Sequence, residues 1–270
     1  MGTGAMILLV DAGNSRIKWA SLSEAGMDAV AYVRQPAFGD YQGVLDAWRD
    51  LPAPERVVIA NVAGEACATA MRDWVASNWR CDVEFVTAST RAHGVTNAYD
   101  EPARLGVDRW LALIALRAIY EGPVCVFDCG SALTIDVMTA DGRHLGGLII
   151  PGLAMMRRAL SQDIGAVRQS LQHEDEEEAP GKVSLLARDT RSAVTGGTLY
   201  TLIAVIDRIV RDVTEALSDE PICVIAGGDA EQLLPLLSAR YHYEPDLVLK
   251  GLAVVASGSS SAESSTETPE

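Results

Sequence analysis

The sequence has few of the residues that build disulfide frameworks and soft-metal sites. Its 270 residues include five cysteines and four histidines. The cysteines are odd in number and scattered without the paired close spacing of a zinc site, and the histidines form no HExxH pair. We therefore expect reduced thiols, as in cytoplasmic proteins, and no metal held by histidine or cysteine.

Positive charge is scarce as well. The chain has 22 lysines and arginines against 37 aspartates and glutamates, a formal net charge of −15. A charge of this sign repels nucleic-acid phosphates, so we expect no nucleic-acid partner. No apolar run approaches the roughly 20 residues of a membrane helix, and the first six residues are too short and uncharged for a signal peptide. We expect a cytoplasmic protein without a membrane partner.

What the sequence does contain is one pattern that occurs twice. An apolar run at residues 7–10 ends at Asp11, and another at residues 124–127 ends at Asp128. A glycine turn and a stretch of alternating apolar and polar residues follow each acid, which predicts strand, tight turn, strand. The two copies lie about half of the ordered chain apart. They predict an α/β protein of two similarly built halves with the active site between them.

The expected domains are residues 6–121 and residues 122–256. Residues 1–5 and 257–270 are expected to be disordered. The C-terminal segment is mostly Ser, Glu and Thr, with no aliphatic residue after Ala262.

Helical periodicity connects the predicted strands. Residues 103–120 and residues 198–217 have apolar positions at helical spacing, and the second of these segments is apolar around more than one face. A third apolar run at residues 222–225 leads into Gly227, Gly228 and Asp229. This arrangement predicts a strand, a glycine turn and a helix.

The first turn combines groups that suit a phosphate. Glycine permits close approach, the amide and hydroxyl side chains donate hydrogen bonds, a lysine adds positive charge, and the aspartate can hold Mg²⁺ through water. Its residues are Asp11, Ala12, Gly13, Asn14, Ser15, Arg16, Ile17 and Lys18. Taken alone, the segment also fits an ordinary hairpin.

The second turn favours the functional interpretation. It runs from Asp128 through Ser131 to Asp136, and two acid-bearing turns at one cleft can hold a nucleoside triphosphate from both sides. Gly227 and Gly228 provide a surface without side chains on which adenosine can lie. The GxxxxGK[ST] motif of P-loop kinases and the GxGxxG motif of Rossmann dehydrogenases are both absent.

In this order, the motifs resemble those of the bacterial type III pantothenate kinases, within the actin-like and sugar-kinase superfamily. The resemblance covers residues 7–256, with Ser15 and Ser131 where threonine is common in the two phosphate motifs. Thr190 matches a threonine that contacts pantothenate, although Asp189 stands where asparagine is frequent. The residues similar to the family's pantothenate motif are Tyr99, Gly106, Val107, Asp108 and Arg109.

The resemblance implies two ribonuclease H-like (actin-like ATPase) domains that transfer phosphate from ATP to pantothenate, the first step of coenzyme A biosynthesis. It also implies Mg²⁺, a monovalent cation (K⁺ or NH₄⁺) near Asp128, and a homodimer in which Thr190 reaches the partner's pantothenate site.

The chemistry of phosphoryl transfer suggests roles for two residues of the pantothenate motif independently of the family. Phosphoryl transfer to an alcohol needs a carboxylate that accepts the hydroxyl proton, and Asp108 is the expected base. Arg109 can bind the pantothenate carboxylate through two parallel hydrogen bonds. Alone, this segment also fits a helix start with a surface salt bridge.

Two other functions fit the sequence less well. Relatives of these kinases have been described as accessory transcription factors, but the intact Asp11, Asp108 and Asp128 argue against an inactive enzyme. A kinase for another small acceptor, such as a sugar or acetate, would differ in the residues that line the acceptor pocket.

Overall fold

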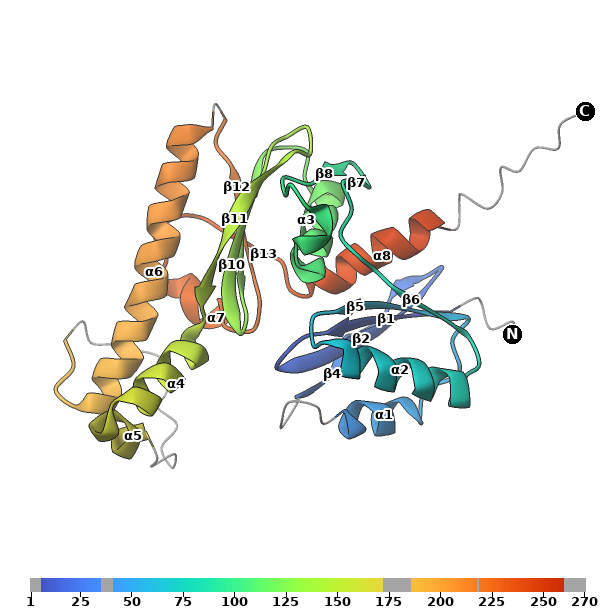
Figure 1. Ribbon diagram of the computed structural model, residues 1–270. Coiled ribbons are helices and arrows are strands. Elements are labelled where there is room, and N and C mark those ends of the chain that lie inside the picture. The colour runs from blue at the N-terminus through green and yellow to red at the C-terminus, as the bar shows by residue number, and fades with distance from the viewer. Residues whose placement is uncertain (1–5, 35–40, 172–185, 218, 260–270) are drawn as a thin grey trace, which may run out of the picture. The chain divides into compact units, whose positions relative to one another are not determined.

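The computed structural model describes residues 6–34, 41–171, 186–217 and 219–259 (Figure 1). The chain forms two compact units. Unit 1 comprises Met1–Glu121, Met138–Leu145 and Asp246–Glu270, and unit 2 comprises Gly122–Val137 and Gly146–Pro245. The expected disordered residues 1–5 and 260–270 lie outside the described residues, whereas residues 257–259 belong to a helix.

Unit 1 contains a sheet with the order β3-β2-β1-β5-β6, and β4 pairs with β2. The two strands of the first predicted hairpin are antiparallel, and the sheet continues from β1 through two parallel strands. The strands are β1 (Ile7–Ala12), β2 (Arg16–Ser23), β3 (Gly26–Met27), β4 (Ala31–Arg34), β5 (Arg56–Asn61) and β6 (Asp82–Phe85). A separate two-stranded sheet pairs β7 (Arg91–Ala92) with β8 (Val95–Thr96).

Helices cover both faces of the first sheet. Figure 1 shows α1 and α2 on one face and α8 on the other. Leu8, Val10 and Ile17 point toward the first of these faces, where they join a core that includes Trp48. Because β1 is buried on both faces, it is apolar throughout until Asp11. The helices of this unit are α1 (Gln42–Trp48), α2 (Glu65–Asn78), α3 (Val107–Ile119), α8 (Leu247–Ser259) and the short 3₁₀ helix η1 (Pro102–Arg104).

A glycine brings α8 against α3. A Cβ on Gly251 would lie 2.2 Å from the carbonyl oxygen of Leu111, so only glycine permits this approach of the two helices. Helix α8 also contacts β1 and β5. The final helix therefore belongs with the first half of the chain, which differs from the two contiguous domains expected from the sequence. Pairing between segments so distant in the chain leaves no local sequence pattern.

Unit 2 contains a sheet with the order β11-β10-β9-β12-β13. Strand β12 is parallel to both β9 and β13. The strands are β9 (Val124–Cys129), β10 (Ala132–Met138), β11 (His144–Pro151), β12 (Ile222–Ala226) and β13 (His242–Tyr243). The helices are α4 (Leu153–Asp163), α5 (Gly165–Leu171), α6 (Thr190–Ala216), α7 (Ala230–Leu233) and the 3₁₀ helix η2 (Leu234–Leu236).

The two sheets have the same order of elements. In each, a strand that ends near an aspartate lies between its hairpin partner and a parallel strand, and a further parallel strand follows. The two similar α/β halves predicted from the repeated motif are thus confirmed.

Helix α6 begins eight residues before the expected start at residue 198. Asp189 caps it, because its side chain accepts a hydrogen bond of 2.9 Å from the backbone N–H of Ser192. By length and composition alone α6 could span a membrane, with a mean hydropathy of 1.4 over its most apolar window. Its residues Leu199, Leu202 and Ile206 are buried in the core of unit 2, which accounts for this hydropathy in a core helix.

Candidate active site

The first turn connects β1 and β2 in unit 1. The backbone N–H of Gly13 donates a 3.0 Å hydrogen bond to the carbonyl oxygen of Arg16, which closes the turn, and Asn14 and Ser15 are exposed at its tip. Asp11 and Lys18 are directly opposed across the two strands, so their side chains lie on the same face of the sheet. The turn therefore presents a carboxylate, an ammonium group and two polar tip residues together.

Three residues of this turn have side chains that are already engaged within the protein. Ala12 and Ile17 are buried in the core, so only their backbone groups are available to a ligand. The Lys18 ammonium lies 2.7 Å from a carboxylate oxygen of Asp246, the residue that precedes α8. Sequence reasoning did not find this ion pair, because its members are 228 residues apart.

Asp108 lies in the first turn of α3, beside a glycine that makes room for its carboxylate. Its Oδ1 accepts a 2.9 Å hydrogen bond from the backbone N–H of Arg109. A Cβ on Gly106 would lie 2.5 Å from the same oxygen. Gly106 thus permits the carboxylate to fold back over the start of the helix, where the helix dipole also favours an anion.

Arg109 and Tyr99, predicted separately as substrate residues, are in direct contact. The Arg109 guanidinium donates a 2.9 Å hydrogen bond to the Tyr99 hydroxyl, and Arg109 is only 5% exposed. The ring of Tyr99 in turn stacks on His144, with 6.3 Å between the ring centroids. A guanidinium held in this way keeps a fixed orientation, as a binding site for a carboxylate requires.

The other predicted residues near this helix differ in exposure. Val107 is buried. In unit 2, Thr190 is the exposed first residue of α6.

The second turn, between β9 and β10 in unit 2, is closed by a hydrogen bond from Gly130 N–H to the carbonyl oxygen of Ala132. Gly152 packs against this turn: its Cβ, if present, would lie 2.6 Å from the carbonyl oxygens of Gly130 and Ser131. Ser131 is exposed, so its hydroxyl is accessible to a ligand. The segment after β11 is therefore in contact with the phosphate motif that precedes it.

The glycine turn after β12 completes this cluster. Asp128 is paired in register with Ala226, so the two strands end side by side. Gly227 has a positive φ of 89°, and a Cβ there would lie 2.4 Å from the Cys129 carbonyl and 2.5 Å from Asp128 Oδ1. Gly228 is exposed. The structure thus brings together the residues of unit 2 that the sequence assigned to the nucleotide.

A half-buried cation, not found from the sequence, lies near the same turn. Arg157 of α4 donates a 3.1 Å hydrogen bond from Nε to Thr198 of α6, and its Nη2 is buried without a hydrogen-bond partner among the described residues. Burial lowers the pKa of Arg157, and the negative charge of Asp229 opposes this shift. Asp229 precedes α7 and makes no side-chain hydrogen bond that caps this helix.

The cysteine next to Asp128 is held in its neutral form. Burial raises the pKa of the Cys129 thiol, and the charges of Asp128 and Asp229 add to the shift, so the thiol stays neutral. Within the described part of the chain no three His, Cys, Asp or Glu side chains cluster as metal ligands. The donors at the two turns are the carboxylates of Asp11 and Asp128, which suit hard cations such as Mg²⁺ and K⁺.

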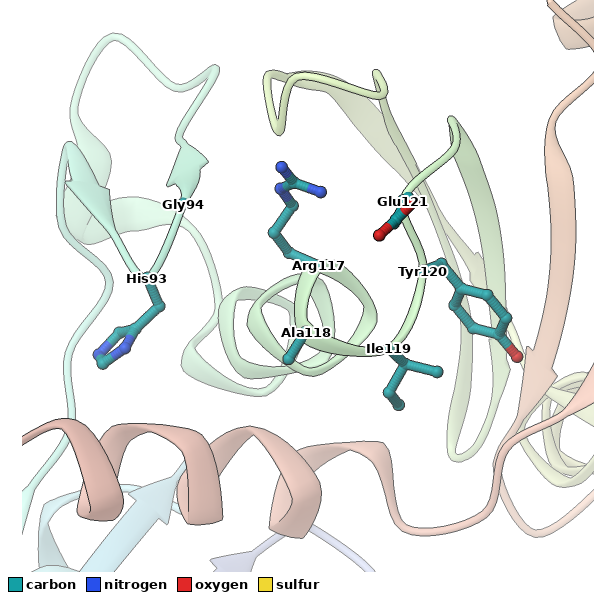
Figure 2. A pocket seen from close by; sticks show the side chains of 7 residues that line it. All are labelled: His93, Gly94, Arg117, Ala118, Ile119, Tyr120 and Glu121. Atoms are coloured by element: carbon teal, nitrogen blue, oxygen red, sulfur yellow. The ribbon is translucent and has the colours of Figure 1, made fainter.

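A separate hollow of about 570 Å³ lies in unit 1 at the far end of α3 (Figure 2). Figure 2 shows Arg117 pointing away from α8, whereas His93 points toward it. This hollow contains none of the predicted site residues. Asp108 is in the first turn of α3 and Arg117 in the last, so the hollow is distinct from the predicted active site.

Solved structures of two other proteins have a similar fold. One is a conserved protein from Campylobacter jejuni proposed to be a Baf family transcriptional activator, with a TM-score of 0.60, 19% identity and coverage of 94% of this chain and 99% of that one. Another, from Sinorhizobium meliloti, is proposed to be a 2-dehydro-3-deoxygalactonokinase, with a TM-score of 0.51, 15% identity and coverage of 93% and 98%. At these identities the likeness shows the fold alone, an α/β fold that this chain shares with both structures over more than 90% of its length.

Sequence comparison is more specific. The type III pantothenate kinase family profile matches residues 7–212. A type III pantothenate kinase from Nitrosococcus oceani is 42% identical over 267 residues, covering 97% of this chain and 98% of the relative. The chain belongs to the type III pantothenate kinase family, and it is a kinase.

The glycine at position 227 allows a test of the second turn. Gly227→Ala is expected to destabilise the fold by about 1–3 kcal/mol and to raise the KM for ATP, because its methyl group displaces the Asp128 carboxylate. Gly26→Ala is the control: Gly26 also has a positive φ, of 113°, but a Cβ there meets no atom within 4 Å. Thermal unfolding and steady-state kinetics measure both effects. An unchanged KM for ATP in Gly227→Ala would refute the role of this turn in nucleotide binding.

Proposed function

We propose that the protein transfers the γ-phosphate of ATP to pantothenate, forming 4′-phosphopantothenate and ADP as the first step of coenzyme A biosynthesis. The pantothenate hydroxyl oxygen forms a bond to the γ-phosphorus, the bond from that phosphorus to the β–γ bridging oxygen breaks, and the hydroxyl proton passes to Asp108. The observation that carries the proposal is the arrangement around Asp108, with Arg109 and Tyr99 in contact beside it, in a member of this family.

The acceptor is held by unit 1 residues with different roles. Arg109 binds the pantothenate carboxylate, and Tyr99 fixes the orientation of its guanidinium. Gly106 and Val107 contribute backbone groups, because Gly106 has no side chain and the Val107 side chain is buried. Asp108 is the general base, in hydrogen-bonding reach of the helix N-terminus.

ATP is held by the two turns. Residues 11–18 and Ser131 bind its phosphates, and Gly227 with Gly228 supports the adenosine. Asp11 holds Mg²⁺ through water, and Asp128 holds a monovalent cation, K⁺ or NH₄⁺. Their hard carboxylate oxygens and the neutral Cys129 thiol support these ions over softer metals. The ions offset the negative charge of the transferred phosphate.

The working form is a homodimer in the cytoplasm, with neither nucleic acid nor membrane as a partner. The net charge of −15 supports the absence of nucleic acid. Exposed apolar side chains on β11 and α4, namely Leu148, Ile149 and Met155, support a subunit interface in unit 2. Thr190 contacts pantothenate in the active site of the partner.

A panel of acceptors tests the function. The protein is incubated with ATP, Mg²⁺ and K⁺, and ADP release is measured with pantothenate, glycerol, acetate and a hexose. We expect pantothenate alone to give sustained ADP formation, because Arg109 requires a carboxylate and Asp108 a nearby hydroxyl. Equal turnover with any other member of the panel would refute the assignment.

Asp108→Asn tests the base. The amide keeps the size of the side chain but accepts no proton, so kcat is expected to fall by roughly 10²- to 10⁴-fold while ATP affinity changes little. Asp73→Asn, on the exposed surface of α2, is the control and is expected to keep wild-type kcat. If Asp108→Asn retained full kcat, the base would have to be another carboxylate.

Mixed dimers test the role of Thr190. Asp108→Asn and Thr190→Ala are co-expressed with different tags, and doubly tagged dimers are purified. If Thr190 acts on the partner's site, each mixed dimer has one doubly damaged site and one intact site. Before purification, half of the dimers are expected to be mixed, and half of the sites in each mixed dimer are intact. About a quarter of wild-type activity is therefore expected to return in the unseparated mixture. Mixed dimers without recovered activity would show that Thr190 does not act across the interface.

A further inference from the structure

The ion pair between Lys18 and Asp246 is shielded from water more than a typical surface pair. Its N···O distance is 2.7 Å, and the two side chains are 23% and 24% exposed. In the pair of Arg104 and Glu101, by comparison, the side chains are 75% and 69% exposed. Limited exposure strengthens the attraction between the charges, because less water screens them.

The place of this pair in the fold gives it a role in nucleotide binding. Lys18 lies directly opposite Asp11, at the end of β1 where the first turn begins. We propose that Asp246 competes with the phosphates of the nucleotide for Lys18 and so sets the affinity of the site. This proposal rests on the proposed function, in which the first turn holds the phosphates of ATP.

The expected direction follows from the charges. A lone ammonium group attracts a phosphate strongly, whereas an ammonium paired with a carboxylate has little net charge to offer. Removing the charge of Asp246 is therefore expected to tighten nucleotide binding, whereas a residue that only positioned Lys18 would weaken binding when removed.

Asp246 also occupies a junction in the chain. The chain leaves unit 2 at Pro245 and enters unit 1 at Asp246, one residue before α8. Asp246 has a positive φ of 57°, a conformation that aspartate and asparagine tolerate better than most residues. When phosphates take Lys18, the side chain at this junction loses its partner. Nucleotide binding would therefore change the contacts of the residue at which the chain passes from unit 2 to unit 1.

A double-mutant cycle tests the competition. ATP affinity is measured by calorimetry without pantothenate for wild type, Asp246→Asn, Asp246→Gly, Lys18→Met and the double variant Lys18→Met/Asp246→Asn. We expect both Asp246 variants to bind ATP roughly three- to tenfold more tightly and Lys18→Met to bind it about tenfold more weakly. In the Lys18→Met background, the gain from Asp246→Asn is expected to fall below about twofold.

Two controls separate this effect from others. Asparagine and glycine both accept the positive φ of residue 246, so a shared change in affinity reports the lost charge rather than backbone strain. Glu84→Gln removes the same charge from another ion pair of unit 1, with Arg56, and is expected to leave ATP affinity unchanged. Adenosine, which has no phosphate, is expected to bind wild type and Asp246→Asn equally.

Each contrary result has a distinct meaning. If Lys18→Met weakens ATP binding but both Asp246 variants bind ATP equally or more weakly than wild type, Asp246 does not compete and the inference fails. If Lys18→Met leaves ATP affinity unchanged, Lys18 is not a phosphate ligand and the inference also fails. In both cases pantothenate-dependent ADP formation, measured separately, still decides the proposed function.

Discussion

The burial of one strand in each sheet determines where the polar groups of this protein can lie. In β1, Leu8, Leu9 and Val10 are inaccessible to solvent, and β9 is likewise buried over its apolar residues. A carboxylate within such a strand would lose its hydration and need compensating hydrogen bonds, whereas at the strand end it keeps access to water or a ligand. Asp11 and Asp128 occupy those ends. The positions of both turns, and of the glycines packed around them, depend on this constraint.

The turns also depend on glycines, because a residue without a side chain lets two backbone segments come close together. Gly152 and Gly227 are packed so closely on the second turn that a methyl group would overlap its carbonyl oxygens. Gly106 plays the corresponding part beside Asp108, and Gly251 holds α8 to α3. A serine or alanine at any of these positions would displace a backbone segment or a carboxylate rather than a flexible side chain.

Local patterns in the sequence predicted most of the fold, and long-range contacts account for what they missed. The apolar runs that end in Asp11 and Asp128 predicted two hairpins correctly, because strand burial and turn chemistry are local properties. The start of α6 was placed too late, since Asp189 caps the helix before a glycine pair that is typical of a turn. The family's pantothenate motif named Tyr99 and Arg109 without predicting the contact between them, and the partners of Lys18 and Arg157 come from distant segments without any shared motif.

The cations of the candidate site share one property that bears on how an acidic protein binds an acidic ligand. Lys18 is matched by Asp246, Arg157 lies in the field of Asp229, and Arg109 donates to Tyr99. In a chain with a net charge of −15, such matching stabilises partly buried positive groups. A phosphate or carboxylate that binds Lys18 or Arg109 must replace or share an existing partner of that cation. The binding free energy of this ligand is then the difference between its own interaction with the cation and the interaction of the existing partner. The acidic residues around the site therefore influence ligand binding as directly as the basic ones.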